Sequence, residues 1–263
     1  MPGVDLNADI GESFGVYVIG DDEHLVPLLT SANVACGFHA GDPSVIDRTI
    51  GWVARAGVAL GAHPGFADLA GFGRRAVSAT GHEIEVSVAY QVAAVEGMGR
   101  RAGVRMQHVK PHGALYTQAW HSQPVAAAIA QGVASLGGGL ILVAPWGSEL
   151  ARSGIAAGLA VAYEGFPERG YSADGSLLPR GMPGAILSDP EEVAERALEM
   201  ALESRTTASD GTRVQLEVDT LCIHGDNPAA VAIARAVRSR LTAAGVPLGP
   251  MAEWVRGRRA LSG

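Results

Sequence analysis

Lysine, cysteine and aromatic residues are scarce in this chain of 263 residues. Of its 20 Lys and Arg residues only Lys110 is a lysine, two residues are cysteines, and aromatic side chains make up 5% of the sequence. Two cysteines are too few for a disulfide framework, and they lack the spacing of a zinc site. Because Cys36 and Cys222 each lie in an apolar run, we expect buried free thiols in a reducing compartment.

Basic segments are also missing. The formal net charge is −7 and no basic stripe or tail occurs, so nucleic acids and anionic membranes are poor candidates as partners. The first residues lack the charged and apolar regions of a secretory signal. The uncharged stretch 122–148 contains Pro124 and three glycines at 137–139, which predicts a buried helix, a turn and a strand rather than a membrane span. We therefore expect a cytoplasmic protein.

Several catalytic motifs are absent. Without a G-x-S-x-G elbow or a cysteine beside a histidine, acyl-enzyme catalysis has no support. No Walker P-loop and no G-x-G-x-x-G turn follows a predicted strand, so a nucleotide site of either kind is not indicated. No H-E-x-x-H occurs, and any metal site would have to be assembled from separate strands.

The apolar residues fall into short runs that are spread evenly along the chain. Seven of them stand out: Val4–Ile10, Ala32–Phe38, Val58–Ala62, Met106–Val109, Leu140–Ala144, Leu159–Tyr163 and Leu221–Ile223. Alternation of such strands with helices predicts a parallel sheet. Polar residues end almost every run, which favours a closed barrel over an open sheet. We predict an α/β fold, a single β/α-barrel domain over residues 1–263.

Helix start signals mark four segments between these runs, which begin at Asp42-Pro43, Thr80, Asp189-Pro190 and Asn227-Pro228. Glycines end three of them, at Gly57, Gly103 and Gly245. The segment Phe166–Ile186 is rich in Gly and Pro, and we expect it to form a long loop over the mouth of the barrel.

Polar residues alternate along the first run. Side chains in a strand alternate between two faces, so Asp5, Asn7 and Asp9 share one face, which would point into a barrel. Buried carboxylates are costly unless they are paired or ligated. A solvated edge strand would also explain the pattern, but it leaves Glu12 unexplained.

The only lysine lies between two histidines. Pro111 disfavours a helix at Lys110, and in an extended segment His108, Lys110 and His112 share one face. A compact ammonium can donate hydrogen bonds in a site where a larger guanidinium does not fit, so Lys110 is a candidate site residue. The presence of a single lysine by chance is the alternative.

Further histidines stand where strands should end. They are His39, His63 and His224, the last of which shares a face with Thr220, Cys222 and Asp226. A lone histidine is more often a core residue. Five histidines at four strand ends instead indicate an active site, because strand C-termini form the active face of a β/α barrel.

Arginines in two turns are candidates for binding an anion. Arg74 and Arg75 belong to a Gly-rich turn, and Arg180 lies in a second Pro/Gly turn. A guanidinium binds a carboxylate or phosphate bidentately, but exposed turns would have the same composition.

Long motifs in this chain resemble the family of 5-oxoprolinase A subunits, also described as lactam-utilisation proteins. They are DLNADIGESFG (5–15), SANVACGFHAGD (31–42), GAHPGF (61–66), DLAGFGRR (68–75), HVKPHGALY (108–116) and HGDNPAA (224–230). The segment 163–171 departs from the family pattern, and Glu168 takes the place of its acidic residue.

The resemblance implies a distorted seven-stranded barrel similar to polysaccharide-deacetylase-like barrels. It implies ATP-dependent opening of 5-oxo-L-proline to L-glutamate, with ATP and Mg²⁺ as cofactor, which a partner subunit could bind, and with subunits B and C as partners. The catalytic cluster would comprise Asp5, Asn7, Asp9, Glu12, His39, His63, Lys110, His112 and His224.

Roles within the cluster follow from side-chain chemistry. Lys110 could hold an oxyanion or a phosphoryl oxygen, and a carboxylate or histidine of the cluster could deprotonate water. Arg74, Arg75 or Arg180 could bind the substrate carboxylate. Two alternatives stay open. One is a metal-dependent N-deacylase that uses the same carboxylates and histidines, and the other is a lactam-binding subunit without catalytic activity.

Overall fold

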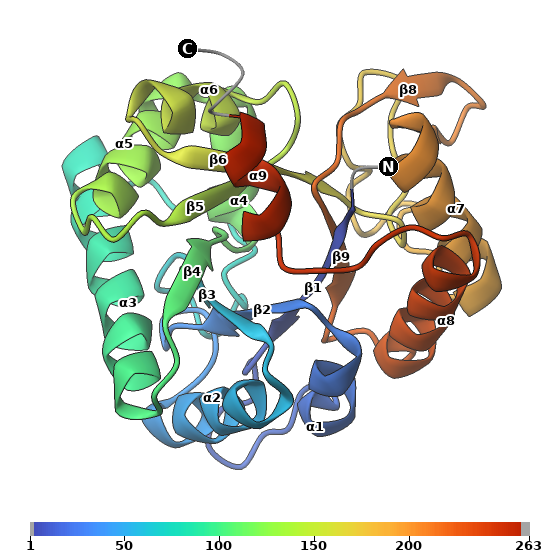
Figure 1. Cartoon of the computed structure of the whole chain (residues 1–263). Helices are drawn as coiled ribbons and strands as arrows, with labels where there is room; N and C mark the ends of the chain where they lie inside the picture. Colours follow the sequence, from blue (N-terminus) through green and yellow to red (C-terminus); the bar gives the residue numbers. More distant parts are fainter. Residues whose placement is uncertain (1–2, 259–263) are drawn as a thin grey trace.

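Seven parallel strands close into a barrel in the computed structural model, which describes residues 3–258 (Figure 1). The hydrogen-bonded order is β1-β2-β3-β4-β5-β6-β9, and β9 pairs with β1. The strands are β1 (Asp5–Ile10), β2 (Ser31–Ala35), β3 (Ala59–His63), β4 (Met106–Val109), β5 (Ile141–Ala144), β6 (Ala160–Gly165) and β9 (Thr220–His224). Each of the seven predicted runs therefore overlaps a strand, with bounds that differ by at most three residues at either end, and the prediction of a closed barrel is confirmed.

Helices surround the barrel (Figure 1). They are α1 (Asp22–Leu25), α2 (Pro43–Ala56), α3 (Gly81–Arg101), α4 (Gly113–His121), α5 (Gln123–Ala134), α6 (Glu149–Ala156), α7 (Pro190–Glu203), α8 (Ala230–Ala243) and α9 (Ala252–Arg258), with a 3-10 turn η1 (Val26–Leu28). A small antiparallel pair, β7 (Arg205–Thr207) and β8 (Arg213–Gln215), follows α7.

The predicted helix starts are largely confirmed. Asp42 caps α2 by accepting hydrogen bonds from two backbone N–H groups, and Thr80 forms a capping box with Glu83 at the start of α3. The last long helix is the exception, because α8 begins at Ala230 rather than at Asn227-Pro228. The side chain of Asn227 instead accepts a hydrogen bond from the N–H of Ala229 and forms a turn before the helix.

Strand β1 is buried on both faces, as a barrel strand must be. Leu6, Ala8 and Ile10 pack with the large apolar core under the helices, and the polar residues of β1 point into the barrel. The barrel is uneven, since β6 and β9 pair over only two positions and the register of β3 and β4 shifts at Gly61.

Part of the barrel interior is apolar. Inward side chains of β5 and β6 form a small second cluster with α9, made of Ile141, Val143, Ala162, Met251 and Val255. The polar residues of the interior therefore gather on the other strands and at the end of β6.

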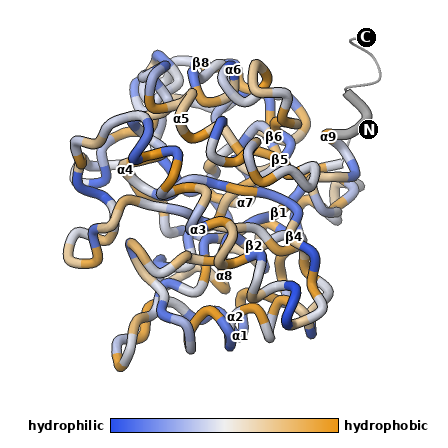
Figure 2. The backbone as a smooth tube through the Cα atoms, turned by 90° about the vertical axis from the view of Figure 1, so that its left-hand side faces the viewer, coloured by the Kyte–Doolittle hydropathy of each residue, from blue (hydrophilic) through white to orange (hydrophobic). Residues whose placement is uncertain are grey.

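Hydrophobic and hydrophilic stretches alternate over short distances along the backbone (Figure 2). In the part of the chain that the structure describes, no helix has the length and apolar character needed to cross a membrane. The uncharged stretch 122–148 folds into α5, a Gly turn and β5, as the sequence predicts.

Candidate functional site

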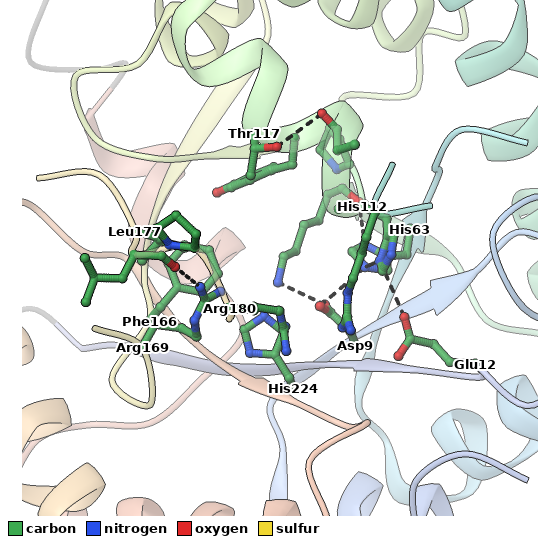
Figure 3. Close-up of a pocket in the computed structure, with 18 residues that line it drawn as sticks. Asp9, Glu12, His63, His112, Thr117, Phe166, Arg169, Leu177, Arg180 and His224 are labelled. Atoms are coloured by element: carbon green, nitrogen blue, oxygen red, sulfur yellow. Dashed lines mark hydrogen bonds and ion pairs between the residues drawn. The ribbon is translucent and has the colours of Figure 1, made fainter. Parts of the chain in front are cut away.

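A cavity of about 490 Å³ opens at the C-terminal ends of the strands (Figure 3). Its polar lining comprises Asp9, Glu12, His63, Arg74, Lys110, His112, Tyr116, Thr117, Arg169, Arg180 and His224. Apolar side chains of Phe166, Leu177, Leu178 and Pro179 also line it, and Phe166 and Leu177 lie next to Arg169 and Arg180 (Figure 3). The segment 166–186 thus covers the mouth, as the sequence predicts.

The structure brings most of the predicted residues together. Six of the nine cluster residues line the cavity, and His39 lies directly behind Glu12, with its Nε2 3.4 Å from Glu12 Oε1. Asp5 and Asn7 lie below the cavity and do not line it. Strand alternation correctly predicts that they face the interior, but not how deep they lie.

Asp5 is a structural residue at the bottom of the site. Its carboxylate accepts hydrogen bonds from the hydroxyls of Thr30 (2.6 Å), Ser31 (2.7 Å) and Thr220. Burial raises the pKa of Asp5 to about 6, against the opposing effect of these hydrogen bonds. Asp5 is thus bonded to hydroxyls below the cavity, and its catalytic role stays a prediction.

Asn7 belongs to a layer of amides above Asp5. Its amide donates to Thr220 Oγ1 (2.6 Å) and Glu164 Oε1 (3.2 Å), while its oxygen accepts from Asn33 (2.7 Å). Asn33 Oδ1 in turn lies 2.7 Å from His108 Nε2. These bonds hold neighbouring strands in register, so Asn7 positions the residues above it and does not reach a ligand in the cavity.

The ring of His108 fills the space in which a side chain at Gly61 of β3 would lie. A Cβ added to Gly61 would lie 2.1 Å from His108 Nε2. Burial, followed by the charge of Lys110, lowers the pKa of His108 to about 3, which keeps the imidazole neutral. His108 is therefore part of the packed interior, although it shares a face with Lys110 as predicted.

Lys110 is the central cation of the site. Its Nζ lies 2.8 Å from Glu164 Oε1, 2.9 Å from Asp9 Oδ1, 2.9 Å from Cys222 Sγ and 3.5 Å from Asn7 Oδ1. Burial alone would lower the pKa of Lys110, but Asp9, Cys222 and Glu164 outweigh it and raise this pKa well above its ordinary value. Lys110 is thus an ammonium held by two carboxylates and not a base.

Asp9 links this cation to the histidines. Its Oδ2 lies 3.4 Å from His63 Nε2, while its Oδ1 accepts from Lys110 and from Asn33 (2.9 Å). Burial raises the pKa of Asp9, but His63 and Lys110 together hold it well below its ordinary value. Asp9 is therefore a carboxylate near neutral pH.

His224 and Glu168 form a dyad on the other side of the cavity. The carboxylate of Glu168 contacts His224 Nδ1 and accepts hydrogen bonds from the His224 N–H (2.8 Å) and the Asn227 amide (3.0 Å). The ring of His224 stacks on Phe166 at a centroid distance of 5.9 Å. With Nδ1 held by a carboxylate, Nε2 is the nitrogen available to accept a proton, as in a general base. The position of Glu168 beside His224 is consistent with the acidic place that the resemblance implies for it.

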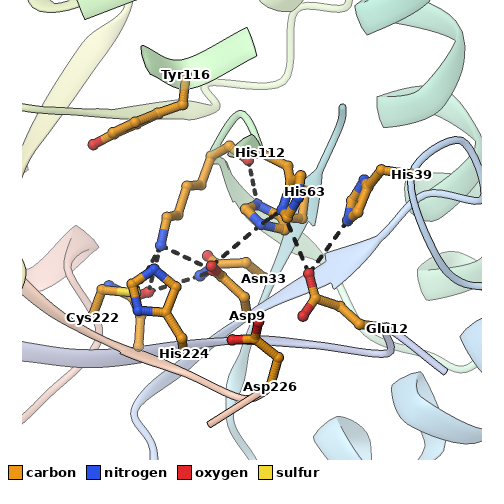
Figure 4. A network of polar contacts seen from close by, with 12 residues as sticks. Asp9, Glu12, Asn33, His39, His63, His112, Tyr116, Cys222, His224 and Asp226 are labelled. Atoms are coloured by element: carbon orange, nitrogen blue, oxygen red, sulfur yellow. Dashed lines mark hydrogen bonds and ion pairs between the residues drawn. The ribbon is translucent and has the colours of Figure 1, made fainter. Parts of the chain in front are cut away.

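Three histidines converge on the far wall (Figure 4). His63 Nδ1 lies 2.7 Å from the carbonyl oxygen of Lys110, and His112 Nε2 lies 2.8 Å from that of Phe72. The rings of His39 and His112 stack in parallel at 3.7 Å, and His63 stands perpendicular to both. Burial lowers the pKa values of His39 and His112 well below the ordinary value, and neighbouring histidines add to this.

Glycines in the matching motifs make room for these rings. A Cβ at Gly65 would lie 2.7 Å from His39 Nδ1, and one at Gly73 would lie 2.7 Å from His39 Cβ and 2.9 Å from His112 Cδ2. Phe72 itself has φ 55°, a left-handed conformation that is strained for a bulky residue. This conformation presents its carbonyl to His112, so the turn positions the cluster.

The predicted arginines divide between two environments. Arg74 lines the cavity and pairs with Asp226 (2.5 Å), and Arg180 also lines it, 4.0 Å from the same carboxylate. Arg75 turns away, pairs with Asp68 and exposes 66% of its side chain. The prediction that Arg75 binds substrate is therefore not supported, because its guanidinium does not reach the cavity.

Glu164 and Arg169 are among the residues of the site that the sequence analysis does not predict. Glu164 ends an apolar strand in which Ala160, Ala162 and Glu164 share one face, so the period of two contained a signal for it. Arg169 binds the backbone of its own loop, donating to the carbonyls of Ala185 (2.9 Å) and Leu178 (2.7 Å), and no motif predicts such a contact.

Comparison with known proteins gives a consistent result over nearly the whole chain. Residues 4–256 match the model of the LamB/YcsF family. The 5-oxoprolinase A subunit of Methylococcus capsulatus is 51% identical over 254 residues, which cover 97% of this chain and 98% of that protein. The crystal structure of a lactam utilization protein from Thermus thermophilus is similar, with a TM-score of 0.89, 47% identity and coverage of 94% and 99%.

A more distant structure shares the fold alone. A putative cellobiose-phosphate cleavage protein from Enterococcus faecalis aligns with a TM-score of 0.55 at 12% identity, over 96% of this chain and 98% of that chain.

Proposed function

Because the chain belongs to the LamB/YcsF family, we propose that it is the A subunit of a 5-oxoprolinase, which opens 5-oxo-L-proline to L-glutamate with hydrolysis of ATP. The observation that carries the proposal is the 51% identity to a relative named as the A subunit of 5-oxoprolinase, over 97% of the chain. The cavity supports it, because its groups suit a small polar ring that bears a carboxylate.

The substrate would lie between the two walls of the cavity. Arg180 and Arg74 at the rim provide guanidinium groups for the carboxylate of 5-oxoproline. Phe166 and Leu178 offer apolar surface for the ring methylenes. The lactam bond would then face His224 on one side and His63 and His112 on the other.

A stable lactam needs activation before water can attack it. ATP with Mg²⁺ would phosphorylate the carbonyl oxygen, and we assign the nucleotide to partner subunits B and C, because this chain has no Walker motif. Water deprotonated by His224 would attack the activated carbon, and cleavage of the C–N bond, with that proton passed on to the leaving nitrogen, would give a glutamyl phosphate. Hydrolysis of this acyl phosphate by a second water would release glutamate and inorganic phosphate. Glu168 would orient His224 and stabilise its imidazolium form.

Lys110 has a different role in this scheme from the one expected from the sequence. Its N–H donors are directed at Asp9, Glu164 and Cys222, so binding an oxyanion would require it to release one of these acceptors. The thiol of Cys222 is the weakest of the three. Lys110 would therefore act first as the fixed positive charge that holds the side chains of Asp9 and Glu164 in place.

We also propose that the protein is cytoplasmic, as the sequence predicts. Cys36 and Cys222 are both buried and unpaired with each other, which suits a reducing compartment.

The test is release of glutamate from 5-oxoproline in the presence of ATP and Mg²⁺. The chain would be assayed alone, with candidate subunits B and C, and with those subunits in its absence. We expect release only from the complete mixture and its loss on His224→Asn, whereas His82→Asn on the exposed face of α3 keeps the rate. Equal rates from subunits B and C without this chain would overturn the proposal.

A further inference from the structure

Beside the proposed lactam site lies a group of four ligand atoms with an arrangement that hydrogen bonds within the protein do not explain. The group consists of Glu12, His39, His63 and His112, all buried, with one ligand atom from each within 4.8 Å of all the others. These residues come from the ends of four neighbouring strands of the barrel, β1 to β4, or from the segments that follow them.

Two of the nitrogens face each other without an obvious proton. His63 Nδ1 and His112 Nε2 each donate to a backbone carbonyl, so in the neutral rings His63 Nε2 and His112 Nδ1 are both acceptors. These two acceptors lie only 2.9 Å apart. Two lone pairs at this distance repel each other unless a positive species lies beside them.

A proton shared by His63 Nε2 and His112 Nδ1, with Asp9 Oδ2 3.4 Å from His63 Nε2, would explain only half of this arrangement. It would join His63 to His112 but leave His39, neither of whose ring nitrogens makes a hydrogen bond among the described residues. Glu12 Oε1 likewise accepts no hydrogen bond in this part of the chain, although it lies 3.4 Å from His39 Nε2 and 3.5 Å from His112 Nδ1. Buried polar atoms are rarely left without a partner, so a further cationic group is indicated.

The distances match the edges of a small coordination sphere. In a tetrahedral site with metal–nitrogen distances of about 2.0–2.1 Å, ligand atoms lie about 3.3 Å apart. Three of the six separations in the group, 3.4, 3.5 and 2.9 Å, are close to this value. His39 would turn out of its parallel stack on His112 to bind, because an ion lies close to the plane of each imidazole that holds it. Backbone carbonyls also hold the second nitrogens of His63 and His112, which is the usual arrangement behind metal-bound histidines.

We propose that Glu12, His39, His63 and His112 bind one divalent transition-metal ion, with zinc or a similar borderline ion as the preferred class. Three imidazoles and one carboxylate are the ligands that such ions select, whereas Mg²⁺ and Ca²⁺ prefer oxygen alone. Glu12, His63 and His112 also line the cavity, so the ion would lie within reach of a bound ligand. Use of the ion to polarise the lactam carbonyl would rest on the proposed function, whereas binding of the ion does not.

The experiment measures binding and uses neither lactam nor ATP. Chelator-treated protein would be titrated with Zn²⁺ by calorimetry and with Co²⁺ by visible absorption, which reports the ligand set directly. We compare the unaltered chain with His39→Ala, Glu12→Gln and the control His82→Ala. His39 makes no side-chain hydrogen bond to the described residues that its removal would break, and circular dichroism checks that each variant is folded.

We expect one ion per chain, with affinity reduced in His39→Ala by more than the roughly 10- to 100-fold that loss of an outer-sphere partner costs. Glu12→Gln should change the Co²⁺ spectrum, and His82→Ala should change neither quantity. Failure of the unaltered chain to bind a stoichiometric ion would overturn the proposal, as would equal affinity and spectrum in the folded His39→Ala variant. Either failure leaves the glutamate-release test unaffected, so the two proposals stand or fall separately.

Discussion

Replacing Lys110 by methionine would show how much of the stability of the barrel depends on one buried charge. The ammonium side chain has 3% exposure, and its Nζ lies 2.9 Å from Asp9 Oδ1 and 2.8 Å from Glu164 Oε1. Methionine has a similar length but no charge, so the variant leaves two carboxylates buried together without a counter-ion. Breaking a buried ion pair in this way typically costs about 3–5 kcal/mol.

We therefore expect the free energy of unfolding of Lys110→Met, measured by urea denaturation at pH 8, to fall by about 3–5 kcal/mol. Removing one of the two carboxylates as well, in Lys110→Met with Glu164→Gln, should recover at least about 1 kcal/mol, because the two positions are coupled. Lys110→Arg should also be destabilised, by about 1–3 kcal/mol, since the larger planar group does not fit between these partners.

A loss below about 1 kcal/mol in Lys110→Met would contradict this prediction, because it would mean that the buried carboxylates do not need the cation. Full activity of Lys110→Arg in the assembled enzyme would separately refute the argument from the single lysine.

Three further predictions concern other parts of the site. Burial raises the pKa of Asp5 from 3.8 to about 6, so between these pH values the folded protein holds a proton that the unfolded chain has lost, and the free energy of unfolding falls as pH rises. Asp5→Asn should remove up to about 3 kcal/mol of this fall, which is measured by urea denaturation at pH 4 and at pH 7. Gly61→Ala should lower the free energy of unfolding by more than about 1 kcal/mol, because the added Cβ would lie 2.1 Å from the imidazole of His108. Gly97→Ala in α3, where the added Cβ meets open space, should raise it by up to about 1 kcal/mol. Similar melting temperatures for the two variants would contradict this prediction. Glu168→Gln should lower kcat for glutamate release by roughly 100-fold or more while the fold persists, and an unchanged pH–rate profile would exclude the orienting role of this carboxylate on His224.

The barrel was predictable because its strands are short apolar runs ended by polar residues. Each predicted run overlaps a strand, and the period of two correctly placed Asp5, Asn7 and Asp9 in the interior. The same rule would have found Asn33 and Glu164, which alternate with small or apolar neighbours on β2 and β6.

Depth and turn geometry were not predictable in the same way. Strand alternation says which face a side chain occupies but not its height, which is why Asp5 and Asn7 were expected at the ligand and lie beneath it. Arg74 and Arg75 are adjacent, and only the folded turn decides that one lines the cavity while the other pairs with Asp68. The hydrogen bonds of Arg169 to its own loop depend on the positions of backbone carbonyls, which no pattern of side chains in the sequence predicts.

We propose that 5-oxoproline binds in the cavity at the strand ends, with its carboxylate at the arginine rim. The most direct test is the KM for 5-oxoproline of the assembled enzyme with Arg180→Gln, compared with Arg75→Gln. Loss of a hydrogen bond to a charged group should raise KM roughly 10-fold or more in Arg180→Gln, while Arg75→Gln keeps the unaltered value. Equal KM values for the two variants would contradict the claim and place the lactam outside this cavity.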